Sequence, residues 1–273
     1  MNEARAKVRL IGLPTDSHSS FLRGPAAAPA AIRGALWSDH SNTAAEGGLV
    51  LGDDIAVEDA GDLPLDESPN DVEHIRAAAE RAAREGVTPL FLGGDHMVTN
   101  PIVGGISAAR GPLNILHFDA HPDLYEDFAG DPLSHASPFA RIMERGDAKR
   151  LVQVGIRTAN RHCREQAQKY GVETVEMRDF DAAKVPIPGA PLYISIDLDA
   201  LDPAFAPGVS HHEPGGLSVR DILSVLQRVP GPIVGADVVE LNPSRDINGM
   251  TAVVAAKLIK ELAALSVRGG EIH

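Results

Sequence analysis

The amino-acid sequence predicts a three-layer α/β/α fold, in which a central, mostly parallel sheet of roughly eight strands lies between two layers of helices. The first observation is that short apolar runs alternate with longer segments of helical periodicity from Thr88 to Leu265. Such alternation is typical of a parallel sheet with helices on both faces. The second observation is that several apolar runs end abruptly in aspartate or histidine, as Leu113–Phe118 does before Asp119. Ligands bind beyond the carboxyl ends of the strands in such sheets, so we expect a site there.

The N-terminal third contains a first strand, two helices and one weakly patterned segment. Val8–Leu13 is an apolar run that predicts the strand. An alanine-rich helix follows from Pro25 to about Trp37, with its prolines near the start, where a helix tolerates them. Residues 41–61 are polar around one apolar piece, Leu49–Leu51, where we expect a strand and long turns. Asp71–Glu85 has alanine and charged residues at helical spacing, and the glycine that follows is a helix stop.

The rest of the chain alternates regularly between the two kinds of element. Strands are predicted at Thr88–Leu92, Leu113–Phe118, Leu151–Gly155, Val172–Met177, Pro191–Asp197 and Ile233–Val239. Helices are predicted at Thr99–Arg110, Pro138–Glu144, Arg161–Tyr170, Ser218–Gln227 and Thr251–Leu265. No internal repeat or linker interrupts the pattern, so we expect a single domain over residues 1–273.

Composition excludes several classes of protein. The 273 residues are 44% hydrophobic and 23% charged, and no apolar run approaches the ~18 residues of a membrane span. The net charge of −13 argues against a nucleic-acid partner, which requires a basic surface, and would attract a small cation. The N-terminus lacks the apolar core of a secretory signal, and the single cysteine, Cys163, fits a reducing compartment. We therefore expect a cytoplasmic protein that has neither a membrane nor a nucleic acid as a partner.

Three predicted strands end in side chains that can bind a metal ion. The candidate ligands are His96, Asp119, His121, Asp123, Asp197 and Asp199. Any one of these segments alone is equally consistent with a turn, but matched residues at several strand ends favour one shared site. Nitrogen and oxygen ligands without a thiolate suit manganese, magnesium, iron or zinc. Six ligands are too many for one open catalytic ion, and two ions that share carboxylates can activate water at neutral pH.

The same segments resemble the signatures of the ureohydrolase family, the binuclear manganese group that includes arginases and agmatinases. The three principal matches are Gly93–His96 (Gly-Gly-Asp-His), Asp119–Asp123 (Asp-Ala-His-Pro-Asp) and Ser195–Pro203 (Ser-Ile-Asp-Leu-Asp-Ala-Leu-Asp-Pro). The likeness extends over almost the whole chain through Gly24–Pro25, Ser134–Ser137, Gly155–Arg157, Pro207–His211, Glu213–Gly216 and Gly235–Pro243. The Ser-His-Ala-Ser and Gly-Val-Ser-His segments are most similar to those of plant-type arginases.

The resemblance implies an arginase-like fold, two Mn²⁺ ions per subunit and a role for each candidate residue. One ion would be held by His96, Asp119, Asp123 and Asp197, and the other by Asp119, His121, Asp197 and Asp199. Asp119 and Asp197 would bridge the two ions and so belong to the catalytic set. Glu240 would pair with the substrate guanidinium, to which a carboxylate can bond in a bidentate way. His135 would pass a proton to the leaving amine, and imidazole titrates in the right range for that step.

Other implied features concern the substrate and the assembly. Asn160 follows the Gly-Ile-Arg segment where animal arginases bind the α-amino group through an aspartate, and His211 is a candidate at the mouth of the site. His117 lies inside its strand and is expected to pack or to support a ligand. The family forms homotrimers and homohexamers, so we expect the same here.

The chemical alternatives remain open at the level of the sequence. Arginine, hydrolysed to ornithine and urea, is favoured by the plant-type likeness. Agmatine is one alternative, because Glu126, Asp127 and Asp131 would tolerate a second cation, and guanidinobutyrate is another. A metal-dependent deacylase and a non-catalytic metal-binding homologue are the other two classes; Glu240 argues against the first and the complete ligand set against the second.

Overall fold

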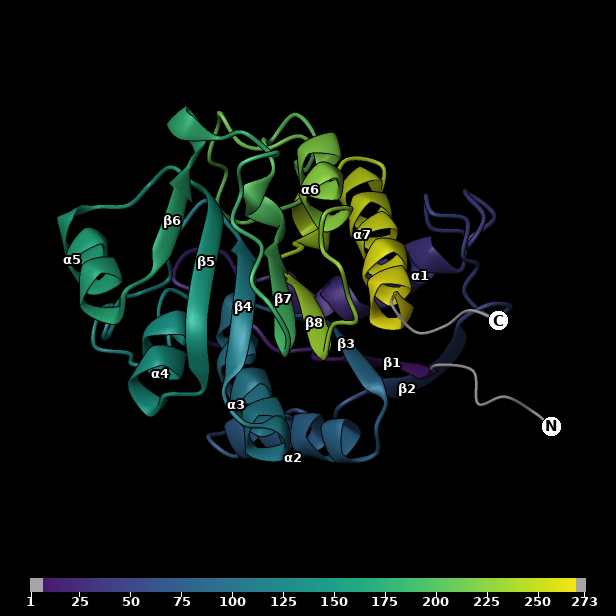
Figure 1. Ribbon diagram of the computed structural model, residues 1–273, viewed down its shortest axis with the longest axis horizontal. Coiled ribbons are helices and arrows are strands. Elements are labelled where there is room, and N and C mark those ends of the chain that lie inside the picture. Colours follow the sequence, from purple (N-terminus) through teal and green to yellow (C-terminus); the bar gives the residue numbers. More distant parts are fainter. Residues whose placement is uncertain (1–6, 269–273) are drawn as a thin grey trace.

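The computed structural model describes residues 7–268, which form one eight-stranded sheet flanked by helices (Figure 1). The strand order is β2-β1-β3-β8-β7-β4-β5-β6, and all the pairs of neighbouring strands are parallel. The strands are β1 (Lys7–Gly12), β2 (Ala56–Asp62), β3 (Thr88–Leu92), β4 (Leu113–Phe118), β5 (Ala148–Ile156), β6 (Glu173–Glu176), β7 (Leu192–Asp197) and β8 (Gly235–Val239).

Side-chain alternation along the strands creates two apolar cores, one on each face of the sheet. In β4, for example, Leu116 and Phe118 belong to one core, whereas Leu113 and Ile115 belong to the other. The first core is covered by α1, α6 and α7, and the second by α2, α3, α4 and α5 (Figure 1). The helices are α1 (Ala28–Leu36), α2 (Asp71–Arg84), α3 (Thr99–Arg110), α4 (Pro138–Arg145), α5 (Arg161–Tyr170), α6 (Val219–Leu226) and α7 (Met250–Val267). None of these helices, all within residues 7–268, has both the length and the apolar character needed to cross a membrane.

The predicted fold class is confirmed, and residues 41–61 contain most of one strand, as expected. That strand is β2, at Ala56–Asp62, while the apolar piece Leu49–Leu51 forms only isolated bridges. β2 is an edge strand whose side chains are mostly exposed, so it carries no run of buried residues that a sequence pattern would detect.

Glycine allows two close approaches that shape the molecule. A Cβ at Gly94 would lie 1.7 Å from the carbonyl oxygen of Thr15, so only glycine lets the chain after β3 pass the N-terminal loop. A Cβ at Gly105 would lie 2.2 Å from the carbonyl oxygen of Arg76, which shows how tightly α3 packs on α2. The first contact fixes the path of the chain into His96, two residues later.

Candidate metal centre and active site

The candidate site lies at the carboxyl ends of four strands that are consecutive in the sheet: β3, β8, β7 and β4. His96 begins a 3-10 turn after β3, and Asp119 follows β4 directly. Asp197 ends β7, and Glu240 follows β8. Because parallel strands end at the same edge, residues up to 144 positions apart in the sequence meet here, as the 2.9 Å bond from the His96 amide to Glu240 Oε1 shows.

One group of ligand-type side chains surrounds the ring of His96. Its Nδ1 atom lies 3.2 Å from Asp119 Oδ2, 3.0 Å from Asp123 Oδ2 and 3.2 Å from Asp197 Oδ2. All four residues are buried. One nitrogen and three carboxylate oxygens at these distances form a set of ligands that can coordinate a metal cation.

A second group is centred on His121, at the pocket side of the first. Its Nδ1 atom lies 3.0 Å from Asp199 Oδ2 and 3.4 Å from Asp119 Oδ1. Asp119 therefore presents one oxygen to each histidine. The structure thus brings all six sequence-predicted metal ligands together in two adjoining groups that share Asp119.

The hydrogen bonding behind His96 shows which of its nitrogens is free to bind a metal. The buried carboxylate of Asp237 accepts hydrogen bonds from Ser195 Oγ (2.7 Å), Tyr193 OH (2.6 Å) and Thr99 Oγ1 (2.8 Å). Since Ser195 donates to Asp237, its oxygen accepts from His96 Nε2, 3.0 Å away. Nε2 is thereby committed to Ser195, and Nδ1, buried without a hydrogen-bond partner among the described residues, is the nitrogen that faces the three carboxylates. A divalent metal ion at this point would be bound by Nδ1 in place of a proton.

The electrostatics of the aspartates lead to the same conclusion. Burial raises the pKa of Asp197 well above its usual range, and the charges of Asp199 and Asp119 raise it further. Burial likewise raises the pKa of Asp199, to about 6. Carboxylates gathered away from water repel one another, so a cation at their centre would relieve the repulsion.

His117 lies close enough to His96 and Asp119 to share a metal, but its hydrogen bonds exclude that role. Gln153 Nε2 donates to the carbonyl oxygen of Pro122 (2.6 Å) and lies 3.1 Å from His117 Nδ1, so Nδ1 accepts. The other nitrogen, Nε2, donates to Asp119 Oδ2 at 2.9 Å. Both nitrogens are occupied, and His117 supports Asp119 from behind.

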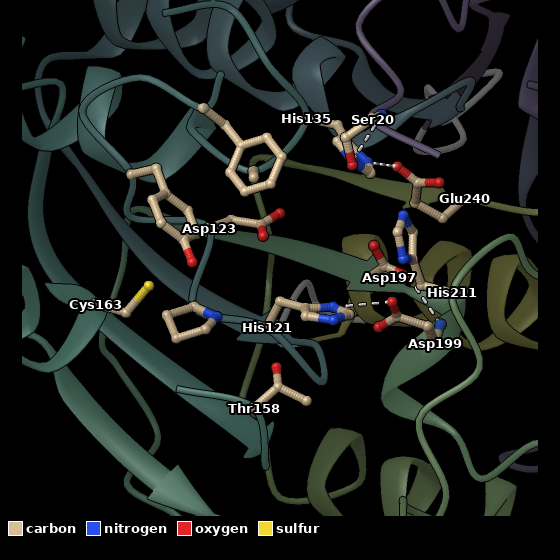
Figure 2. A pocket seen from close by; sticks show the side chains of 14 residues that line it. Ser20, His121, Asp123, His135, Thr158, Cys163, Asp197, Asp199, His211 and Glu240 are labelled. Carbon is tan, nitrogen blue, oxygen red and sulfur yellow. Dashed lines mark hydrogen bonds and ion pairs between the residues drawn. The ribbon is translucent and has the colours of Figure 1, made fainter. Parts of the chain in front are cut away.

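His135 and Glu240 are bonded to each other at the upper edge of the site (Figure 2). The His135 Nδ1 atom lies 2.8 Å from Glu240 Oε1. Burial alone would lower the pKa of His135, but the charge and hydrogen bond of Glu240 raise it to about 9. Glu240 has a φ of 65°, and Asp123 one of 49°, values that side chains other than glycine rarely adopt and that occur often at functional sites.

Ser20 is a residue of the site that the sequence did not single out. Its Oγ atom lies 2.7 Å from His135 Nε2, and its backbone amide donates to the same nitrogen at 3.2 Å. The Ser/His-rich composition of residues 16–20 was the only signal. Ser20 reaches the site because its loop runs beside the loop of residues 124–134, to which the 2.7 Å pair of His18 and Asp131 also ties it.

Several of the side chains described above line one pocket of about 170 Å³ (Figure 2). Its lining residues are Ser20, His121, Pro122, Asp123, Tyr125, Phe128, His135, Ala136, Thr158, Cys163, Asp197, Asp199, His211 and Glu240. The ring of His211 lies between those of His121 and His135, with centroids 5.9 and 5.4 Å away. His211 therefore lines the pocket, as expected of a residue at its mouth.

Asn160 does not line the pocket, in contrast to its expected place beside the substrate. Its Oδ1 atom accepts from the amide of Cys163 (2.9 Å) and caps α5, and its Nδ2 atom donates to Tyr125 OH (2.6 Å). A sequence pattern cannot show that both the oxygen and the nitrogen of an asparagine side chain form hydrogen bonds within the protein.

The comparisons with known proteins agree with this geometry. The family described as the arginase family matches residues 6–264. Arginase 1, mitochondrial, of Arabidopsis thaliana is 49% identical over 96% of this chain and 81% of its own length. The mitochondrial arginase of Medicago truncatula is 50% identical over 93% of this chain and 80% of its own length. A solved structure of arginase from Medicago truncatula superposes with a TM-score of 0.91, at 49% identity over 96% of this chain and 88% of that one.

The comparisons also correct one expectation. The cytoplasmic location expected from the sequence is wrong on this evidence, because the relatives just described are named mitochondrial and a further one chloroplastic/mitochondrial. The expectation rested on the lack of a secretory signal, which says nothing about organelle targeting, since transit peptides are amphipathic rather than apolar.

The resemblance to ureohydrolases, and to plant-type arginases in particular, is confirmed by the family match, the identities and the superposition. This chain belongs to the arginase family.

Proposed function

We propose that this protein is a manganese-dependent arginase that hydrolyses L-arginine to L-ornithine and urea. The observation that carries the proposal is that four of the six ligand-type residues line one pocket together with Glu240, and that the other two, His96 and Asp119, lie against them. The two plant relatives described above, both named arginases, support arginine as the substrate.

The proposed metal centre holds two Mn²⁺ ions. His96, Asp119, Asp123 and Asp197 would bind one ion, and Asp119, His121, Asp197 and Asp199 the other. The two oxygens of Asp119, one 3.2 Å from His96 Nδ1 and the other 3.4 Å from His121 Nδ1, support a bridging position for this carboxylate. Nitrogen and carboxylate ligands without a thiolate suit manganese. When bound, such ions activate water and stabilise developing negative charge.

Glu240 and His135 would bind and protonate the substrate. Glu240 Oε1 accepts from His135 and from the His96 amide, whereas Oε2 has no hydrogen-bond partner among residues 7–268. A guanidinium group can bond to this open oxygen as a planar cation with several donors. The amine departs readily only when protonated, and His135, held 2.8 Å from Glu240, lies where it can deliver a proton to the leaving nitrogen.

The acidic loop of residues 124–134 offers little support for agmatine. Glu126 is paired with Lys169 at 3.1 Å, and Asp131 with His18 at 2.7 Å. Asp127 accepts from the amide of Gly130. None of the three acids lines the pocket, so a second cationic group on the substrate would find no free carboxylate from this loop.

Two further expectations accompany the proposal. A single domain is supported by the one sheet that contains all eight strands of residues 7–268. Assembly into a homotrimer or homohexamer is proposed from the resemblance to the family alone. A monomer in light scattering would contradict the second expectation.

Urea release from a panel of guanidino compounds tests the proposal. Protein loaded with manganese is assayed with L-arginine, agmatine, guanidinobutyrate and free guanidine, and its metal content is measured. We expect two manganese ions per subunit and the highest kcat/KM with arginine. No urea from any of the four compounds, despite bound manganese, would refute the proposed activity.

A further inference from the structure

Three side chains of the pocket, Ser20, His211 and Glu240, come from segments that are far apart in the sequence (Figure 2). Ser20 lies in the loop after β1, His211 in the loop before α6, and Glu240 directly after β8. Loops keep a fixed position only where contacts hold them. The geometry of the pocket therefore depends on the contacts that join these three segments.

Asn242 lies at the point where the three segments meet, and its side chain is fully buried. The backbone amide of Ser244 donates to one of its side-chain atoms at 3.1 Å, which identifies that atom as the oxygen. The other atom is the amide nitrogen, which donates to the carbonyl oxygen of Arg23 at 3.2 Å and to Ser210 Oγ at 2.9 Å. Both hydrogens of the amide group are therefore used, one for each of the other two segments.

Ser210 continues this connection from its own loop to the loop after β1. It is buried and directly precedes His211. Its oxygen accepts from Asn242, and its own hydrogen is donated to the carbonyl oxygen of Leu22 at 2.9 Å. A carbonyl oxygen can only accept, so the direction of this bond is fixed. Asn242 and Ser210 thus form an unbroken chain of hydrogen bonds through all three segments.

The backbones around Asn242 approach one another very closely. A Cβ at Gly24 would lie 2.2 Å from Asn242 Oδ1, and Gly24 has a φ of 149°, which other residues rarely adopt. On the other side, the Asn242 amide donates to the carbonyl oxygen of Gly208 at 2.7 Å, and Val209 forms a β-bridge with Leu241. No larger side chain fits between these segments, so hydrogen bonds rather than apolar contacts hold the loop after β1 here.

Ser20 lies between two anchors of its loop. At one anchor, Asp95 accepts a hydrogen bond from the backbone amide of His18 at 3.0 Å. At the other anchor, two consecutive carbonyl oxygens accept the bonds from the chain just described. Because so few residues separate the anchors, loss of the second one would move Ser20, whose hydroxyl lies 2.7 Å from His135 Nε2.

We propose that Asn242 and Ser210 are positioning residues for the reaction, and that they act on His135 through Ser20. The inference rests on the proposed function of the same pocket. Neither residue is among the described residues that line the pocket, so neither touches the substrate. Their loss should slow the chemical step while the manganese content and the KM for arginine stay unchanged.

The test combines Ser210→Ala with Ser20→Ala in the manganese-loaded protein. Ser210→Ala removes the donor to Leu22 and the acceptor for Asn242. We expect kcat for arginine to fall about fivefold, the value of one hydrogen bond, while KM and manganese content change by less than about twofold. If Ser210 acts through Ser20, then adding Ser210→Ala to Ser20→Ala should lower kcat by less than about a further twofold. A further drop of about fivefold in the double variant would overturn the proposed route.

Ser244→Ala is the matched control. It also removes a hydrogen bond to Asn242 Oδ1, at 2.6 Å, but that bond lies within the segment after β8 and joins no other loop. The backbone amide of Ser244 still fixes the Asn242 side chain. We expect the kcat of this variant to equal that of the wild type. A loss of rate as large as that of Ser210→Ala would show that any weakening at Asn242 has this effect, and would overturn the proposal.

Two measurements without turnover separate this inference from the proposed function. Backbone amides of residues 19–23 should exchange hydrogen at least about fivefold faster in Ser210→Ala than in the wild type or Ser244→Ala, because an anchor is lost. The ¹⁵N shift of His135 Nε2 in the metal-free protein should move as it does in Ser20→Ala.

The outcomes are distinguishable. If the wild-type protein releases no urea from arginine, the proposed function fails, and these two measurements still test the positioning. If the wild-type protein cleaves arginine, but Ser210→Ala changes neither the exchange nor the shift of His135, the positioning role is overturned while the function stands.

Discussion

His135 Nδ1 lies 2.8 Å from Glu240 Oε1, so the two side chains proposed to act on the substrate are bonded to each other before the substrate arrives. The backbone amide of His96 donates to the same oxygen at 2.9 Å. Glu240 thereby connects the substrate pocket to a proposed metal ligand. A guanidinium group that enters the pocket meets a carboxylate whose orientation is already set.

Glu240 raises the pKa of His135, so substitution of Glu240 should lower that pKa. In Glu240→Gln the pKa of His135 should fall from about 9 toward 6.5, because burial is then opposed only by the smaller effects of Asp123 and Asp95. Histidine NMR titration of the metal-free protein measures the shift. The wild-type pair stabilises the fold fully below pH 6.5, the value for unfolded histidine, and loses this contribution as the pH rises through about 9. The difference in Tm between the two proteins should therefore shrink over that interval, and a constant difference would contradict the pairing.

The substitution Asp197→Asn should abolish manganese binding and yet raise the melting temperature of the metal-free protein. Asp197→Asn should lose manganese and activity together, since it removes a proposed bridging carboxylate. The metal-free variant should nevertheless melt at a higher temperature than metal-free wild type, because one of several mutually repelling buried carboxylates is gone. Elemental analysis and calorimetry measure the two effects. His135→Ala is the matched control, which should keep its manganese and lose turnover; full manganese and normal turnover in Asp197→Asn would exclude the bridging role.

Ser20 should position the ring of His135 without affecting the metals. Ser20→Ala removes the hydroxyl that lies 2.7 Å from His135 Nε2 and keeps the backbone amide bond. We expect a drop in kcat of about fivefold, the value of one hydrogen bond, and a displaced pH profile with unchanged manganese content. Ser20→Thr, which retains a hydroxyl, should recover most of the rate. A fall in manganese content equal to the fall in rate would indicate a general structural defect instead.

Two glycines in helices should respond oppositely to alanine. In α3, Gly105→Ala places a Cβ 2.2 Å from the carbonyl oxygen of Arg76 and 2.9 Å from the Cβ of Ala79, so it should destabilise the fold by about 1–3 kcal/mol. In α1, Gly34→Ala meets no atom within 4 Å and should stabilise the fold by about 0.5–1 kcal/mol. Denaturant unfolding checks both. Equal effects at the two positions would contradict the close approach of α2 and α3.

The parts of the structure that the sequence predicts are those in which burial and chemistry coincide. Leu113–Phe118 is apolar because both faces of β4 are buried, and the ligands stand out because charged residues rarely follow such a run without a role. The bounds of β2 within residues 41–61 could not be predicted, because its exposed side chains at the edge of the sheet follow no apolar pattern.

Tertiary contacts made by small polar residues could not be predicted. Ser20 lies 115 residues from His135 and meets it only because two loops run side by side. Asn160 was expected to bind the substrate, but the amide of Cys163 and the hydroxyl of Tyr125 take up its two polar atoms. Such partners are set by the packing of α5 against the neighbouring loop, which residue spacing does not encode.

The most direct test of the proposed reaction is to identify its products from L-arginine in water enriched in ¹⁸O. Attack of water on the guanidinium carbon, with departure of the amine that His135 protonates, predicts urea carrying one ¹⁸O atom and unlabelled ornithine. Mass spectrometry of the products from manganese-loaded protein measures both. Citrulline and ammonia in place of urea and ornithine, or urea without the label, would contradict the reaction proposed for this site.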